Sequence, residues 1–234
     1  MSKKVGVYVT NYCYREFLLW SLRSIWQQTK RPDFLLFIDD CSVDDSVQVL
    51  ERELQRTGEK LDAFEVNAEN LGTCKTINKA VDILVENGCD YVCGLSADDV
   101  MHPDYIKETY EALKKAPERV GWVYTNVRRF GDENQIDAHP EWNKELHDRV
   151  PFCHGSSLMK AEMLKSVGGF PEVEWQEDYE MFKRASAKGW MGLLVPKPLL
   201  WWRTHNLYRR TEYKNNSSEL RKQLWEKNHA NKEL

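Results

Sequence analysis

The chain has 234 residues, of which 41% are hydrophobic and 30% are charged. This composition is typical of a globular protein and excludes a fibrous or fully disordered one. The formal net charge of -4 gives no electrostatic basis for binding nucleic acid. No apolar run is long enough to cross a bilayer, and the N-terminus lacks the cleavage site of a signal peptide. We therefore expect a cytoplasmic protein without a transmembrane segment.

Short apolar runs alternate with helical patterns in the first half of the chain. We expect strands at 5–10, 33–39, 61–66 and 91–96. We expect helices from about Glu16, over 42–55, over 72–88 with Gly88 as the C-cap, and from Pro103. This alternation predicts a parallel sheet in an α/β fold, and the continuously apolar strands predict helices on both of its faces.

The second half has a less regular pattern. We expect a strand at 121–130, a long polar loop over 131–150, a strand and a short helix within 155–172, a helix over 177–189, and strands at 190–196 and 199–205. No linker separates two cores, so we expect one domain over residues 1–206. Residues 207–234 form a polar tail with a modest helical pattern. Its narrow apolar stripe favours a solvated helix over a dimer contact or a peripheral membrane contact, and we expect a monomer or homodimer.

Six cysteines are present, and none forms a C-x-x-C pair. Most of them sit inside apolar segments or beside expected turns. Small apolar residues in a reducing compartment explain this pattern better than a disulfide framework or a zinc site.

Polar side chains follow three of the expected strands. Asn11 follows the first strand, Asp39 and Asp40 end the second, and Asp98 and Asp99 follow the fourth. Ligands of open α/β sheets bind beyond the carboxyl ends of the strands. A single aspartate there is usually a turn or helix cap, and capping is the favoured interpretation of Asp39 and Asp40 taken alone. Together, the three clusters predict a strongly negative cleft unless a cation neutralises it.

The adjacent carboxylates Asp98 and Asp99 repel each other when both are ionised. A divalent cation such as Mg²⁺ or Mn²⁺ would neutralise them, because hard cations prefer oxygen ligands and keep positions open for substrate phosphates. The alternative is a group of helix-capping acids before Pro103. We favour the cation-binding interpretation.

Seven segments of the sequence match the motifs of one enzyme family, in the same order along the chain. They are "VYVTNYCYREFL", "FIDDCSVDDS", "NLGTCKTINKAV", "LSADDVMHPDYI", "HGSSLMKAEMLKSVGGFPE", "EDYEMFKRA" and "WWRTH". In this order they resemble the opening strand, the D-D-G-S turn, the N-x-G segment, the metal-binding D-x-D, the acceptor-side segment, the E-D motif and the late R-x-H of family 2 inverting glycosyltransferases. The resemblance covers about residues 5 to 205. It implies the GT-A fold, a Rossmann-like α/β fold with a mostly parallel central sheet flanked by helices.

The resemblance also implies roles for residues. Residues 1–116 would bind the nucleotide sugar and 117–206 would face the acceptor. The nucleotide-sugar-binding residues would be Asn11, Tyr12, Glu16, Asp39, Asp40, Asn70, Gly72, Lys75 and Asp98. The metal ligands would be Asp98, Asp99 and His205, with Mn²⁺ or Mg²⁺ as the cofactor. The general base would be Asp178, with Glu177 as its neighbour. Apart from the resemblance, we expect the ring of Trp175 to contact the acceptor, because aromatic faces pack on sugars, and we expect His154 to meet either the acceptor or the leaving phosphate.

The chain departs from the family pattern at several positions. Ser96 stands where the first acid of D-x-D is usual, which leaves open whether Asp98 or Asp99 binds the metal. Cys41 replaces the glycine of D-D-G-S. Ile77 stands where an arginine is common, and Lys75 is the candidate to compensate. These departures bear on the identity of the donor more than on the type of reaction.

The chemistry expected from these residues is sugar transfer. A metal would stabilise charge on a leaving diphosphate, and a carboxylate such as Asp178 would take the proton of an attacking hydroxyl. Asp178 also suits a helix N-terminus, whose dipole favours an acid. We expect a hexosyl- or N-acetylhexosaminyltransferase that uses a nucleotide-diphosphate sugar, chiefly a UDP-sugar, and a glycan, lipid-linked or other hydroxyl acceptor in polysaccharide biosynthesis. A non-catalytic nucleotide-sugar or glycan binder is the alternative, because of Ser96. The lack of a glycine-rich loop after the first strand argues against a pyrophosphorylase or a dinucleotide oxidoreductase.

Overall fold

The computed structural model describes residues 3–173 and 176–205. Its strands are β1 (Val5–Asn11), β2 (Phe34–Asp39), β3 (Ala63–Val66), β4 (Tyr91–Ser96), β5 (Val100–Met101), β6 (Val120–Gly131), β7 (Gln135–Asp137), β8 (Leu158–Lys160) and β9 (Met191–Thr204). Its helices are α1 (Leu18–Trp26), α2 (Ser46–Thr57), α3 (Thr73–Glu86), α4 (Tyr105–Lys115), α5 (Lys144–His147), α6 (Ala161–Val167) and α7 (Glu177–Ala187). Within the described ranges no helix is both long and apolar enough to span a membrane.

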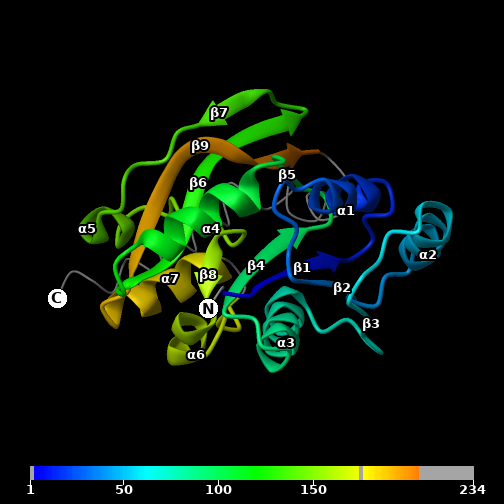
Figure 1. Ribbon diagram of the computed structural model, residues 1–234, viewed down its shortest axis with the longest axis horizontal. Coiled ribbons are helices and arrows are strands. Elements are labelled where there is room, and N and C mark those ends of the chain that lie inside the picture. Colours follow the sequence, from blue (N-terminus) through cyan, green and yellow to red (C-terminus); the bar gives the residue numbers. More distant parts are fainter. Residues whose placement is uncertain (1–2, 174–175, 206–234) are drawn as a thin grey trace.

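The strands form one mixed sheet in the order β3-β2-β1-β4-β8-β6-β9-β5, and β7 pairs with β6 (Figure 1). The first four strands of this order pair in parallel with one another. Because β1, β2 and β4 are buried on both faces, their side chains are apolar at nearly every position. The predicted alternation of strands and helices in this half is confirmed.

Two clusters of buried side chains lie on the two faces of the sheet. One cluster joins the sheet to α1, α2 and α4, and the other joins it to α3, α6 and α7. Alternate residues of β1 belong to different clusters: Val7 and Val9 face the first, and Tyr8 faces the second. The side chains on the Tyr8 side of the sheet therefore determine what lines the space beside α3 and α7.

The second half differs from the sequence-based expectation in three places. The predicted loop over 131–150 contains β7 and α5, and the two predicted terminal strands are one strand, β9. Strand β9 continues through Pro196 and Pro198, which lie where its pairing with β6 is irregular, and such irregularities are where strands tolerate proline. The two-residue strand β5 exists through antiparallel pairing with β9 about a hundred residues away, which no local pattern predicts.

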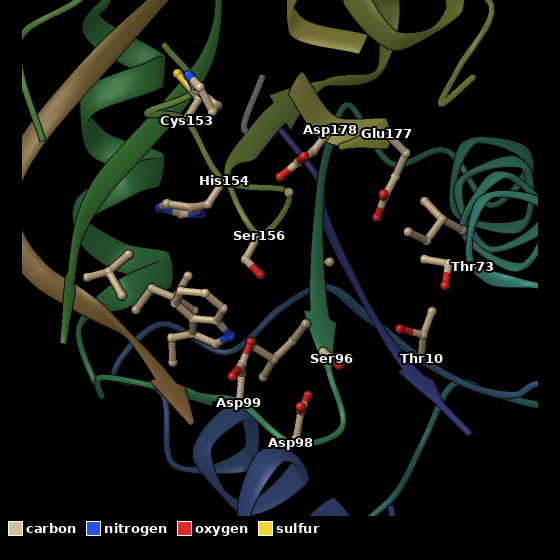
Figure 2. A pocket seen from close by; sticks show the side chains of 18 of the residues that line it. Thr10, Thr73, Ser96, Asp98, Asp99, Cys153, His154, Ser156, Glu177 and Asp178 are labelled. Carbon is tan, nitrogen blue, oxygen red and sulfur yellow. The ribbon is translucent and has the colours of Figure 1, made fainter. Parts of the chain in front are cut away.

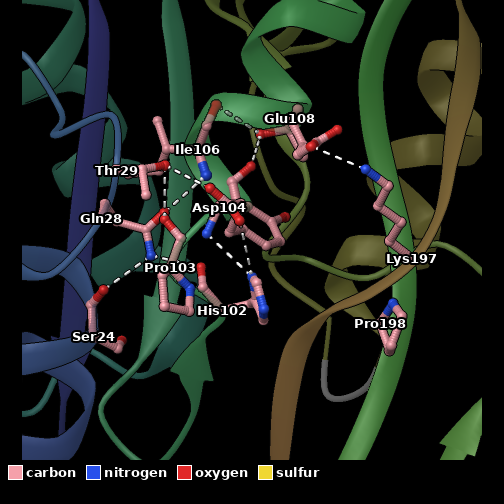
Figure 3. A network of polar contacts seen from close by, with 12 residues as sticks. Ser24, Gln28, Thr29, His102, Pro103, Asp104, Ile106, Glu108, Lys197 and Pro198 are labelled. Carbon is pink, nitrogen blue, oxygen red and sulfur yellow. Dashed lines mark hydrogen bonds and ion pairs between the residues drawn. The ribbon is translucent and has the colours of Figure 1, made fainter.

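A polar network holds the segment that follows Asp99 (Figure 3). The buried side chain of Gln28 donates to the carbonyls of Ser24 at 2.9 Å and His102 at 2.7 Å, and accepts from the N–H of Ile106 at 2.9 Å. The end of α1 is thereby joined to the start of α4. The loop that carries Asp98 and Asp99 is fixed at its far end by these bonds.

Candidate active site

A cavity of about 660 Å³ lies on the α3 and α7 side of the sheet, at the carboxyl ends of β1 and β4 (Figure 2). Its floor includes Tyr8 and Thr10 of β1 and their register partners Gly94 and Ser96 of β4. A Cβ atom at Gly94 would collide with the hydroxyl of Tyr8. The glycine therefore leaves the space that the Tyr8 ring occupies.

Asp98 lies at one end of this cavity, in contact with His205. The Oδ2 atom of Asp98 is 3.1 Å from Nε2 of His205, and both side chains are mostly buried. Burial opposes ionisation of Asp98, but the hydrogen bond from His205 and the hydroxyl of Ser96 outweigh it and hold the pKa of Asp98 below its usual value. Its other oxygen, Oδ1, is buried without a hydrogen-bond partner. This ionised carboxylate therefore has an oxygen available for a cation.

Asp99 has a different environment from its neighbour. Its Oδ1 accepts the backbone N–H of Arg203 at 2.9 Å, and its side chain is buried. Burial and the charge of Asp98 raise the pKa of Asp99 well above its usual value, against the opposing effect of Arg203. Asp99 joins the loop to β9, whereas Asp98 keeps an open oxygen.

The donor set around Asp98 fits a hard divalent cation. A carboxylate oxygen without a hydrogen-bond partner is the ligand type of Mn²⁺ and Mg²⁺ sites that keep positions open for phosphate oxygens. The imidazole of His205 would join such a site by exchanging its hydrogen bond with Asp98 for the metal, a ligand that suits Mn²⁺ better than Mg²⁺. In the described part of the chain, no group of three or more His, Cys, Asp or Glu residues converges to hold a metal alone. A cation here would therefore depend on substrate oxygens for the rest of its coordination.

Asp178 and Glu177 point into the cavity from the start of α7, across from Asp98 (Figure 2). Burial and the charge of Glu177 raise the pKa of Asp178 to about 6, although the N–H groups of Tyr179 and Gly155 favour its charged form. A carboxylate with this pKa is ionised at neutral pH and still basic enough to accept a proton.

His154 also lines the cavity, but as a neutral imidazole. Its Nε2 accepts the N–H of Thr125 at 3.3 Å, and burial with the charge of nearby His139 lowers the pKa of His154 to about 3. A neutral ring offers no positive charge to a phosphate. The predicted acceptor residue Trp175 lies outside the described residues.

Some of the predicted nucleotide-binding residues line a cavity and others do not. Asn11, Tyr12 and Asp40 line a small pocket that shares Thr10 and Ser96 with the main cavity. Glu16 is exposed before α1, and Lys75 lies 3.6 Å from Glu172 in an ion pair at the surface; neither lines the main cavity or the small pocket.

Asp39 and Asp40 make several internal hydrogen bonds. Asp39 accepts from the side chain of Asn11 at 2.6 Å and from the N–H of Ser42 at 2.7 Å. Asp40 accepts the N–H groups of Leu71 at 2.8 Å and Gly72 at 3.0 Å. These bonds shape the turns after β2 and before α3, and neither carboxylate is the N-cap residue of α2 or α3.

Two other predicted positions belong to the same loops. The side chain of Asn70 donates to the carbonyl of Asp40 at 3.3 Å. Cys41, which replaces the family glycine, adopts a φ of 62°, a left-handed conformation in which glycine is far less strained. The turn therefore keeps the geometry that the glycine of D-D-G-S would favour.

Several cavity residues were not predicted from the sequence. Arg129, Asp137 and Trp202 line the cavity from β6, β7 and β9, and Thr73 lines it from the start of α3. Strand periodicity is the signal that could have found Arg129 and Trp202, since alternate residues of a strand share one face. Asp137 could not be found in this way, because the sequence predicts a loop over 131–150.

The Glycosyl transferase family 2 model matches residues 6–168, which include every strand of the parallel half, Asp98 and Asp99. The chain belongs to glycosyl transferase family 2. The resemblance predicted from the ordered motifs is thereby confirmed.

Two curated relatives of this family 2 chain have names that refer to polysaccharide synthesis. The amylovoran biosynthesis glycosyltransferase AmsE of Erwinia amylovora is 24% identical over 175 residues, which are 72% of this chain and 63% of AmsE. The chondroitin synthase of Escherichia coli is 23% identical over 190 residues, which are 79% of this chain and 27% of that protein. The chain thus spans less than two thirds of the length of either relative.

Solved structures confirm the GT-A fold. S. aureus TarS, residues 1–349 in complex with UDP-GlcNAc, superposes with a TM-score of 0.71 at 17% identity, over 89% of this chain and 60% of that one. The mannosyltransferase PcManGT of Pyrobaculum calidifontis, in complex with GDP-Man and Mn²⁺, gives a TM-score of 0.65 at 20% identity, over 86% of this chain and 57% of that one.

Proposed function

We propose that this family 2 chain transfers a sugar from a nucleotide-diphosphate donor to a hydroxyl group of an acceptor, with inversion at the anomeric carbon. The observation that carries the proposal is one cavity with two different carboxylates. Asp98 is ionised and has an open oxygen, and Asp178 has a pKa of about 6. Transfer requires both a site for a charged leaving group and a proton acceptor.

The donor end of the reaction is assigned to Asp98 and His205. They would hold a divalent cation, Mn²⁺ or Mg²⁺, which when bound neutralises negative charge on the leaving diphosphate. The hydroxyl of Ser96 assists by favouring the ionised form of Asp98. Ser96, which stands where the family usually has an acid, thus helps to keep Asp98 ionised. The proposed position of the nucleotide is the end of the main cavity at Thr10 and Ser96, beside Asn11, Tyr12 and Asp40, because the small pocket that these residues line has a volume of only about 30 Å³.

The acceptor end is assigned to Asp178. As the acceptor oxygen forms its bond to the anomeric carbon, the bond from that carbon to the diphosphate oxygen breaks and the hydroxyl proton passes to Asp178. No enzyme nucleophile takes part, so the configuration inverts. Glu177 assists by raising the pKa of Asp178, which makes it a stronger base.

The proposed donor is a UDP-sugar and the proposed acceptor is a glycan or a lipid-linked glycan. The UDP-GlcNAc complex of TarS and the names of the polysaccharide-making relatives support this choice. Comparison of UDP-glucose, UDP-galactose and UDP-GlcNAc as donors distinguishes transfer of a hexose from transfer of an N-acetylhexosamine. We propose that the reaction takes place in the cytoplasm or at the cytoplasmic surface of a membrane. The proposed catalytic domain spans residues 1–206. The tail over 207–234 lies outside the described residues.

A donor screen tests the proposal. The purified chain is incubated with UDP-glucose, UDP-galactose, UDP-GlcNAc or GDP-mannose, with Mn²⁺, with Mg²⁺ or with EDTA, and released nucleotide diphosphate is measured. We expect release from at least one donor that depends on the cation. Calorimetry with UDP and Mn²⁺ runs in parallel. Cation-dependent UDP binding without release from any donor, with a panel of glycan acceptors present, would instead support the non-catalytic binder.

A further inference from the structure

One wall of the cavity is an array of side chains from three neighbouring strands. Arg129 of β6 is the register partner of Trp202 of β9, and Val127 is the partner of Leu200. Asp137 of β7 pairs with Val127 on the other side of β6. All five residues line the cavity. Their spacing by two along each strand explains why they share this face.

The array combines an apolar surface with a polar edge. Val127 and Leu200 are almost fully buried, whereas the Trp202 ring is 38% exposed. The guanidinium of Arg129 lies 5.2 Å from the centre of the Trp202 ring. Its Nε donates to Asp137 at 2.6 Å, so the arginine is held between the ring and the carboxylate. Trp202 is thus a braced aromatic surface within the cavity.

The charges of the array limit what can bind there. Arg129 is paired with two carboxylates, because its Nη1 also lies 2.9 Å from Glu133. The cavity further contains Asp98, Asp178 and their acidic neighbours. A carboxylated or phosphorylated ring would be repelled at this wall. A neutral pyranose fits, since its C–H face packs on an aromatic ring and its hydroxyls donate to a carboxylate.

We infer that Trp202, Arg129 and Asp137 form a subsite for a neutral sugar ring of the acceptor. The inference rests on the proposed function, because it makes the acceptor a glycan. We assign the subsite to the acceptor because β6 and β7 lie beyond β4 and β8 in the sheet, away from the end of the cavity at β1 and α3 that is assigned to the nucleotide. The sugar ring would lie against Trp202, with its hydroxyls towards Asp137.

Saturation-transfer NMR tests this subsite directly. The probes are methyl β-glucoside, methyl β-galactoside and methyl α-mannoside, with methyl β-glucuronide as the anionic control, each added to the chain with UDP and Mg²⁺. We expect transfer to ring C–H protons of at least one neutral probe and at least about tenfold weaker transfer to the glucuronide. Trp202→Ala should abolish the neutral signal, Trp202→Phe should keep part of it, and Asp137→Asn should weaken it.

The control variant is Trp20→Ala. Trp20 is 63% exposed on α1 and does not line the cavity, so this variant should keep the full signal. Circular dichroism of each variant separates loss of the subsite from loss of folding. A neutral signal that survives in folded Trp202→Ala, or equal binding of the glucuronide, overturns the inference. Displacement of the probe by UDP-GlcNAc but not by UDP overturns its assignment to the acceptor.

The outcome is distinguishable from failure of the proposed function. Cation-dependent release of UDP by the wild-type chain, measured without any acceptor, tests transfer chemistry alone. Release together with glycoside binding that ignores Trp202 rejects the subsite and keeps the proposed function. Glycoside binding at Trp202 without turnover of any donor keeps the subsite and rejects the catalytic proposal.

Discussion

The two ends of the cavity hold carboxylates with opposite behaviour. At one end, His205 and Ser96 keep the pKa of Asp98 below its usual value despite burial. At the other end, burial and Glu177 raise the pKa of Asp178 to about 6. The same residue type is thus prepared for two tasks by its surroundings. One site favours a permanent negative charge, and the other favours a group that can gain and lose a proton near neutral pH.

The difference arises from partners rather than from burial, because burial opposes the charged form of both carboxylates. Asp98 has a histidine within 3.1 Å that stabilises its charge. Asp178 has an acid beside it in the sequence and only backbone N–H groups in its favour. Exchange of these partners should therefore change the pKa of each carboxyl group.

The largest expected effect is that of Asp178→Asn on transfer. The amide cannot accept a proton, so kcat should fall by about 10³-fold, while UDP binding measured by calorimetry should change little. The matched control is Glu180→Gln, which lies on the same turn of α7, contacts Lys183 and does not line the cavity. Full transfer by Asp178→Asn would show that the base is another group.

Removal of the charge at the other end should affect cation-dependent binding. Asp98→Asn should weaken UDP binding in the presence of Mn²⁺ by about 10- to 100-fold, and His205→Gln by about tenfold, with little effect in EDTA. Asp99→Asn is the matched control, because its side chain bonds the backbone of Arg203. Calorimetry with and without Mn²⁺ measures all three. Greater loss of cation dependence in Asp99→Asn than in Asp98→Asn would reverse the assignment.

The pH dependence of kcat/KM should show whether Glu177 raises the pKa of Asp178. Below a pH of about 6, Asp178 is protonated and cannot act as a base, so kcat/KM should fall about tenfold per pH unit. Glu177→Gln removes a repulsive charge, which lowers the pKa of Asp178 and should move this limb down by roughly half to one unit. An unchanged limb in Glu177→Gln, at unchanged folding, would contradict the role given to Glu177.

The smallest expected effect is on stability. The pKa of Asp178 is raised in the folded chain, so the stability associated with its neutral form is present below the unfolded pKa and lost as pH rises through about 6. Asp178→Asn should therefore stabilise the chain at pH 8, by on the order of 2 kcal/mol, and by much less at pH 4. Thermal unfolding at the two pH values measures this difference. An equal change of melting temperature at both would argue against a raised pKa.

The sequence was informative where local pattern and burial agree. Strands β1, β2 and β4 are buried on both faces, so their continuous apolar runs were visible without the structure. The helices that separate them were visible from their apolar periodicity. The second half was predicted less well because β5, β7 and the length of β9 depend on pairing between distant segments. A polar segment such as 135–137 has no apolar pattern of its own.

The candidate site shows the same division. The amino-acid sequence was enough to identify the acids that end the strands and the family 2 order of Asp98, Asp178 and His205. The folded chain was needed to show that Asp98 has the open oxygen while Asp99 bonds Arg203, and that Trp202 faces the cavity beside Arg129. Residue type fixes the chemistry that a side chain can perform. Its charge state and orientation depend on neighbours that the chain supplies from about a hundred residues away.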